Sequence, residues 1–128
     1  MKDLIFYLGM AALFTHEIDA MPNHEWRVLP LVRMLPDEIG MFVFVIAHVP
    51  LFALLIALVA SSNDRTRTKS RLIISGFLVL HGLLHALFMN HPNYEFSYML
   101  SNTLIFGGAA FGAIYLGLEF LTNNEAAT

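Results

Sequence analysis

Three long stretches of the chain contain no lysine, arginine, aspartate or glutamate: residues 39–63, 72–94 and 96–118. A membrane-spanning helix needs about 20 mainly apolar residues, so each stretch is long enough to supply one. A shorter apolar run, residues 4–15, precedes a cluster of histidines and acids. We therefore predict an all-α, integral membrane four-helix bundle that forms a single domain over residues 1–128. The expected helices cover about 4–21, 40–61, 72–90 and 97–121.

The connections between these helices differ in character. Residues 22–39 hold three prolines and the amphipathic stretch HEWRVLPLVRML, which favours a short helix lying in the membrane interface, with Asn23 as its N-cap. Residues 61–71 form a polar loop with four basic residues: Arg65, Arg67, Lys69 and Arg71. The positive-inside rule puts this loop and both termini in the cytoplasm, across a bacterial inner membrane. The first helix is expected to be retained and not cleaved as a signal peptide.

Composition supports a membrane protein and excludes several functions. The chain is 57% hydrophobic and 13% charged, whereas soluble domains carry about 25% charged residues. The net charge is −3 and there is no basic tract, so we expect no nucleic-acid partner. The chain has no cysteine, which excludes disulfides and thiolate metal ligands.

All six histidines fall at one depth of the predicted bundle. Because successive helices alternate in direction, every histidine lies within roughly 14 Å of the outer boundary at 1.5 Å per residue. These histidines are His16, His24, His48, His81, His85 and His91. Glu17, Asp19, Glu25 and Glu95 share that layer, whereas the inner half is almost entirely apolar. We therefore expect a polar chamber near the outer membrane face.

Spacing within this layer is typical of metal ligands. His81 and His85 are one helical turn apart, His16 and Asp19 share a face, and His48 precedes the helix-kinking Pro50. Ionisable groups inside a membrane cost about a few kcal/mol each, and no buried lysine or arginine is predicted to neutralise them. A divalent metal ion, zinc or iron, would satisfy them together. The predicted ligands are His16, Asp19, His48, His81 and His85.

The remaining polar residues suit catalysis or the rim of the chamber. Glu17 is the expected general base, and Asn90 and Asn102 are placed to polarise a carbonyl group. His24, Glu25, His91 and Asn102 are expected at the rim or around the ligands. The function predicted first is a metal-dependent hydrolase acting on a lipid-like or amphiphilic small molecule. A di-iron oxidoreductase is the alternative, followed by a non-catalytic metal carrier or sensor, or a haem protein.

The stretch THEIDAMPNHEWRVLP resembles small four-helix bacterial membrane proteins of unknown function that carry a His-Glu-rich first helix. It is more loosely similar to membrane proteins named for an HxxEE motif, although Glu17 follows His16 directly and position 19 is aspartate. These resemblances imply a metal-dependent membrane enzyme without naming its reaction. The layer also resembles the zinc site of ceramidase-type and adiponectin-receptor-type hydrolases. The residues matching that site are His81, His85, His48 or His16, Asp19, and Ser97 or the catalytic candidate Ser101.

The last helix carries small residues at helical spacing. Gly108 and Gly112 are four positions apart, a pattern that lets another helix approach closely. We expect this face to pack inside the monomer or to form a homodimer.

Overall fold

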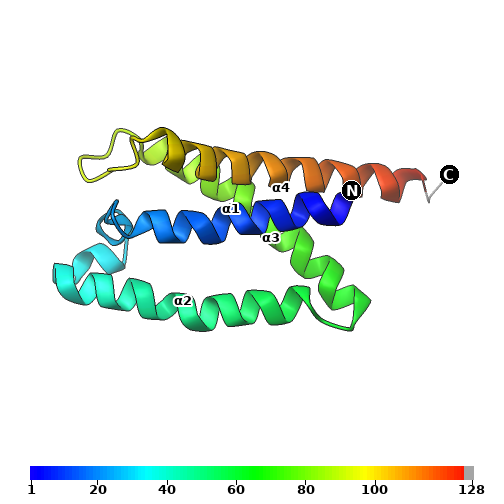
Figure 1. Cartoon of the computed structure of the whole chain (residues 1–128), viewed down its shortest axis with the longest axis horizontal. Helices are drawn as coiled ribbons and strands as arrows, with labels where there is room; N and C mark the ends of the chain where they lie inside the picture. The colour runs from blue at the N-terminus through cyan, green and yellow to red at the C-terminus, as the bar shows by residue number, and fades with distance from the viewer. Residues whose placement is uncertain (126–128) are drawn as a thin grey trace.

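The computed structural model describes residues 1–125, apart from the side chains of Asn123 and Glu125. Within that range the chain is entirely helical and has no strand (Figure 1). The four long helices are α1 (Lys2–Ala20), α2 (Asp37–Val59), α3 (Asp64–Phe88) and α4 (Met99–Glu125). Two short 3₁₀ turns, η1 (Glu25–Arg27) and η2 (Val32–Met34), join α1 to α2.

Helix α4 packs along both α1 and α3, and these three helices form the tightest part of the molecule. Helix α2 contacts α3 and the two 3₁₀ turns, and its side chains also meet those of α1, with the rings of Phe14 and Phe52 4.4 Å apart. The α1–α2 and α3–α4 connections lie at one end of the bundle, and both ends of the described chain lie at the other (Figure 1). The histidines of α1 and α3 therefore converge on the end that carries the 22–36 connection.

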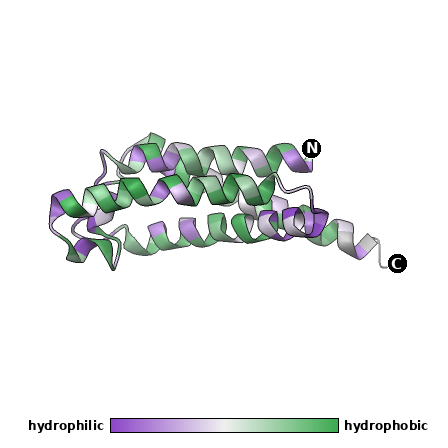
Figure 2. Ribbon diagram, turned by 90° about the horizontal axis from the view of Figure 1, so that it is seen from below, coloured by the Kyte–Doolittle hydropathy of each residue, from purple (hydrophilic) through white to green (hydrophobic). Residues whose placement is uncertain are grey.

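Helices α2, α3 and α4 are each long and apolar enough to cross a membrane. Many large apolar residues of these helices are exposed on the outside of the molecule, as a lipid environment requires, and Figure 2 shows hydrophobic residues along much of their length. Helix α1 is not apolar enough to be a candidate span, because it carries Lys2, Asp3, Glu17 and Asp19 within 19 residues. The prediction of four helices is confirmed, and three of them qualify as candidate spans.

The predicted basic loop at residues 61–71 is wrong in its extent. Helix α3 begins at Asp64, so only residues 60–63 connect it to α2. The early start has a local cause, because the Asn63 side chain accepts a 3.0 Å hydrogen bond from the Thr66 backbone N–H. Arg71 consequently lies on the helix, where it donates hydrogen bonds to Asp3 and Tyr7 of α1.

The predicted interfacial helix is also wrong in its form. Residues 22–36 make the two 3₁₀ turns, because Pro30 and Pro36 cannot supply the backbone N–H groups of a continuous helix. Asn23 does not cap this segment. Its Nδ2 donates a 2.6 Å hydrogen bond back to the Asp19 carbonyl at the end of α1.

Small residues allow α4 to approach its neighbours. A Cβ atom built on Gly112 would lie 2.6 Å from the Ser75 carbonyl oxygen, and one on Gly108 would lie 3.6 Å from the Ala12 Cβ. Of the two roles expected for this glycine pair, packing inside the chain is the one that the structure uses. A homodimer stays a prediction, and it would need a different surface because this one is covered.

Ion pairs tie the helices together at the end remote from the histidines. Lys2 Nζ lies 2.9 Å from Glu119 Oε1, which also accepts a 2.9 Å hydrogen bond from the Tyr115 hydroxyl. Arg71 pairs with Asp3 at 2.6 Å. Lys2 and Arg71 are therefore engaged with acids and tyrosine at this end of the bundle.

Candidate metal centre

Three histidines from two helices meet inside the bundle. His16 comes from α1, and His81 and His85 come from successive turns of α3. One ring nitrogen from each can be chosen so that all three atoms lie within 4.8 Å of one another. His16 is 1% exposed and His85 is 6% exposed, while His81 is half-buried. We call these three residues the histidine cluster.

The carboxylate that faces this cluster belongs to Glu25. Its Oε2 lies 3.5 Å from His16 Nε2, its Oε1 lies 3.8 Å from His85 Nε2, and the residue is 6% exposed. Glu25 is expected from the sequence at the rim or around the ligands, and its contacts fit the second of these positions, while its role stays a prediction. His24 adopts a left-handed conformation, with φ of 49°, and this turn directs η1 back over the end of α1. No periodic pattern in the sequence signals such a turn.

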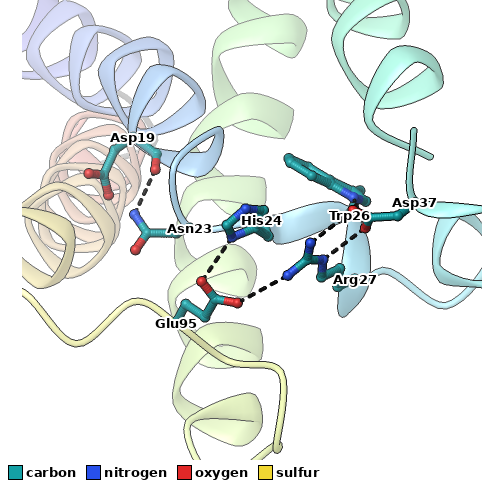
Figure 3. A network of polar contacts seen from close by, with 7 residues as sticks. All are labelled: Asp19, Asn23, His24, Trp26, Arg27, Asp37 and Glu95. Carbon is teal, nitrogen blue, oxygen red and sulfur yellow. Dashed lines mark hydrogen bonds and ion pairs between the residues drawn. The ribbon is translucent and has the colours of Figure 1, made fainter. Parts of the chain in front are cut away.

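A network of hydrogen bonds and ion pairs joins the α1–α2 connection to the start of α2 and to the α3–α4 connection (Figure 3). Arg27 donates two 2.8 Å hydrogen bonds to the carboxylate of Asp37, which also accepts one from Trp26 at 2.9 Å. Glu95 of the α3–α4 connection lies 2.9 Å from His24 Nδ1 and 3.6 Å from Arg27. The hydrogen bond from Arg27 to Asp37 raises the pKa of the guanidinium further above its usual value. Arg27 is thus committed to Asp37 and Glu95, and it does not neutralise Glu25.

Several buried polar atoms of the cluster have no hydrogen-bond partner within the described part of the chain. They are Nδ1 and Nε2 of His16, Nε2 of His81 and Oε2 of Glu25. Buried polar groups are nearly always hydrogen-bonded, because an unsatisfied one costs about 1–3 kcal/mol. Here the unsatisfied atoms are all of kinds that ligate metal ions, and they belong to residues in mutual contact.

Tyr94 and Phe96 complete the surroundings of the cluster, and sequence reasoning missed both. The Tyr94 hydroxyl lies 3.1 Å from His85 Nδ1, and burial, reinforced by the charge of Glu25, raises the pKa of Tyr94 to about 12. Phe96 packs its ring 5.3 Å from that of His16 and 5.0 Å from that of His85. Both precede α4, in a turn that has no helical periodicity to align them with His85.

Two predicted ligands lie outside the histidine cluster. His48 of α2 places Nε2 2.9 Å from Glu17 Oε2, and its Nδ1 donates a 2.7 Å hydrogen bond to the Phe44 carbonyl. Glu17, the predicted base, is therefore paired with His48. Asp19 is half-buried, and its Oδ2 has no partner among the described residues, yet Asp19 is not part of the cluster. Neighbouring positions on α1 thus face different surroundings, because each residue turns the helix by about 100°.

The other predicted residues lie at the same end of the molecule without joining the cluster. Asn90 is exposed, and the half-buried His91 accepts a 3.2 Å hydrogen bond from the Asn93 backbone N–H. Ser101 is fully buried, and no described residue bonds its hydroxyl group. Asn102 donates a 3.2 Å hydrogen bond to the Tyr98 carbonyl. Their catalytic and rim roles stay predictions.

A cavity of about 150 Å³ adjoins the histidine cluster. His81, His85 and Glu25 form part of its wall, together with Tyr94 and a group of apolar residues: Val28, Leu29, Pro30, Leu84 and Phe88. A second cavity, of about 190 Å³, lies between α1 and α2 beside the Glu17–His48 pair. The first cavity gives a small molecule room beside the cluster.

Comparison with known proteins identifies the family of this chain but does not identify an activity. No curated protein and no solved structure matches the chain. The resemblance to HxxEE-motif proteins therefore stays a prediction. The model of a family of unknown function, DUF6713, matches residues 2–122, which include α1 to α3 and all but the last three residues of α4. This chain therefore belongs to the DUF6713 family.

Proposed function

We propose that this protein is a membrane-embedded, metal-dependent hydrolase whose ion is held by the histidine cluster beside Glu25. The observation that carries this proposal is the convergence of His16, His81 and His85, together with the unpartnered, buried ring nitrogens of His16 and His81. Histidines with a purely structural role are normally hydrogen-bonded. A divalent cation would satisfy one ring nitrogen of His16, that of His81 and the negative charge of Glu25 together.

The donor set fits zinc or another borderline divalent ion. Catalytic zinc sites use three protein ligands, commonly histidines, and keep one position for water. Zinc would lower the pKa of that water toward about 7 and so supply a nucleophile at neutral pH. Ligands bound at about 2.0–2.1 Å lie closer together than 4.8 Å, so a small side-chain movement would have to tighten the cluster.

Residues of the chain would position the metal ligands, act as the general base and bind the substrate. Tyr94 fixes His85, because a histidine that ligates through Nε2 carries its proton on Nδ1, which can then donate to the Tyr94 oxygen 3.1 Å away. Glu25 lies 3.5 Å from His16 and 3.8 Å from His85, so a water held at the ion would be within its reach, and we assign Glu25 the part of general base that the sequence suggested for Glu17. The adjoining cavity would receive part of an amphiphilic substrate.

A single ion fits the contacts better than the di-iron alternative. The additional histidine–carboxylate pair, His48 and Glu17, satisfies itself at 2.9 Å and leaves no orphaned atom. Orphaned nitrogens in the histidine layer belong to the cluster alone within residues 1–125. We therefore expect one metal ion per chain, with zinc ahead of iron.

Metal analysis of the protein purified in detergent tests this proposal. We expect about one zinc or iron atom per chain, reduced at least tenfold by His81→Ala or His85→Ala. His48→Ala is the matched control, because it removes a histidine of the same layer from outside the cluster, and it should retain the metal. Equal loss in all three variants, an absence of metal, or a haem absorption band would contradict the proposal.

We also propose that the histidine cluster lies near the outer face of a bacterial inner membrane. The basic residues of early α3 lie at the same end of the bundle as both ends of the described chain, opposite the cluster (Figure 1). The positive-inside rule assigns that basic end to the cytoplasm. A fluorescent protein fused to the C-terminus should therefore fluoresce, whereas alkaline phosphatase fused there should be inactive. The reverse result would overturn the orientation.

A further inference from the structure

The cavity beside the histidine cluster has a polar wall and an apolar wall. Glu25, His81, His85 and Tyr94 supply the polar side, and aliphatic and aromatic residues of the connection and of α3 supply the rest. A ligand that fills this cavity must therefore pair an apolar body with a polar group directed at the cluster.

The volume limits the size of that apolar body. An apolar cavity of about 150 Å³, the volume found here, is known to accommodate benzene. A long acyl chain would not fit inside. The remainder of a larger substrate would have to pass Leu84, which lines the cavity and is 40% exposed on the outside of the molecule.

The polar wall favours a ligand that accepts a hydrogen bond. When His85 Nδ1 donates to the Tyr94 oxygen, the hydroxyl proton of Tyr94 remains free to donate in turn. Tyr94 lines the cavity, so an oxygen acceptor inside it can receive that proton. A carbonyl oxygen is such an acceptor, and it is also a group that a metal ion polarises.

We propose that this cavity is an acyl pocket that binds a compact apolar group, about the size of a benzene ring, attached to a carbonyl held between Tyr94 and the ion. This inference rests on the proposed metal centre and narrows its substrates to esters or amides of compact acids. Leu84, Val28 and Phe88 set the size limit.

Hydroxamates of graded size test the pocket, because a hydroxamate joins a metal-binding carbonyl group to a chosen acyl body. The cobalt-loaded protein in detergent is titrated with acetohydroxamate, benzohydroxamate and 2-naphthohydroxamate, and the visible cobalt spectrum reports binding. Burying the phenyl ring should make benzohydroxamate at least about tenfold tighter than acetohydroxamate. Naphthohydroxamate should bind no more tightly than benzohydroxamate, because its second ring would lie outside the pocket.

Variants distinguish ligand binding inside the pocket from uptake of the ligand by the detergent micelle. Leu84→Trp and Val28→Phe fill the pocket from different elements, so either should remove the preference for benzohydroxamate while cobalt still binds. Leu87→Trp is the control, since Leu87 is 78% exposed on the same helix and does not line the pocket. Affinity that rises steadily with ligand size, or a preference that survives both filling variants, would overturn the acyl pocket alone. Failure to bind cobalt would overturn the metal centre and the pocket with it.

Discussion

The carboxylate of Glu25 lies 3.5 Å from Nε2 of His16, and both side chains are buried. The two residues are joined by the last turn of α1, a turn that contains Pro22, and the left-handed His24. Through this contact the end of α1 and the connection after it form one side of the histidine cluster, while α3 supplies the other. Glu25 therefore lies directly beside the histidine cluster, although it belongs to a connecting segment between two helices.

Replacing Glu25 should weaken metal binding without unfolding the protein. Glu25→Gln keeps the size of the side chain and removes the negative charge beside His16 and His85. We expect zinc affinity to fall by about 10–100-fold, the usual effect of losing a group that supports metal ligands. Competition with a chelating dye measures the affinity. Glu95→Gln, which changes the outer network at His24, is the control, and an equal effect of both variants would contradict the assignment.

Tyr94 should support metal binding through its hydroxyl group alone. Tyr94→Phe retains the ring against Phe96 and removes the oxygen 3.1 Å from His85 Nδ1. We expect a loss of zinc affinity of about 10–100-fold, because the orientation of His85 is no longer fixed. Tyr98→Phe changes an exposed tyrosine of the same connection and should have no effect. Unchanged affinity in Tyr94→Phe would show that Tyr94 does not position His85.

Asp37 should keep the α1–α2 connection closed. Asp37→Asn weakens the paired hydrogen bonds from Arg27 and the bond from Trp26. We expect trypsin to cleave after Arg27 and Arg33 several times faster in this variant, as gel electrophoresis over time can measure. Asp64→Asn removes a partner of Arg67 at the opposite end of the bundle and should leave cleavage in the connection unchanged. A rate that does not respond to Asp37→Asn would mean that other contacts hold the segment.

The packing of α4 against α3 predicts opposite outcomes for two glycines of the same helix. A Cβ atom on Gly112 meets the Ser75 carbonyl oxygen at 2.6 Å, whereas one on Gly117 meets nothing within 4 Å. Gly112→Ala should therefore destabilise the protein by about 1–3 kcal/mol, because α3 must move away. Gly117→Ala should have no cost, or stabilise the helix by about 0.5–1 kcal/mol. Unfolding in graded SDS measures both, and equal stability of the two variants would contradict this packing.

The sequence predicts the helices well because their apolar stretches are long and free of charge. It also predicts the meeting of His16 with His81 and His85, since alternating helices bring those positions to one depth. The start of α3 is missed because the Asn63 cap lets a charged segment join the helix. Tyr94 is missed, and the direct contact of Glu25 with the histidine cluster is not foreseen, for another reason. Both lie in connections whose course depends on single residues, such as the left-handed His24, and on contacts between distant segments.

X-ray absorption at the metal edge tests the central claim most directly, because it reports which atoms surround the ion. The account predicts a single ion with about three imidazole nitrogens and one or two oxygens at about 2.0–2.1 Å, and loss of the imidazole signal in His85→Ala. A shell made only of oxygen would indicate adventitious surface metal and contradict the account. So would a second metal about 3.5–4 Å away, which would indicate a two-metal centre in place of the single ion proposed.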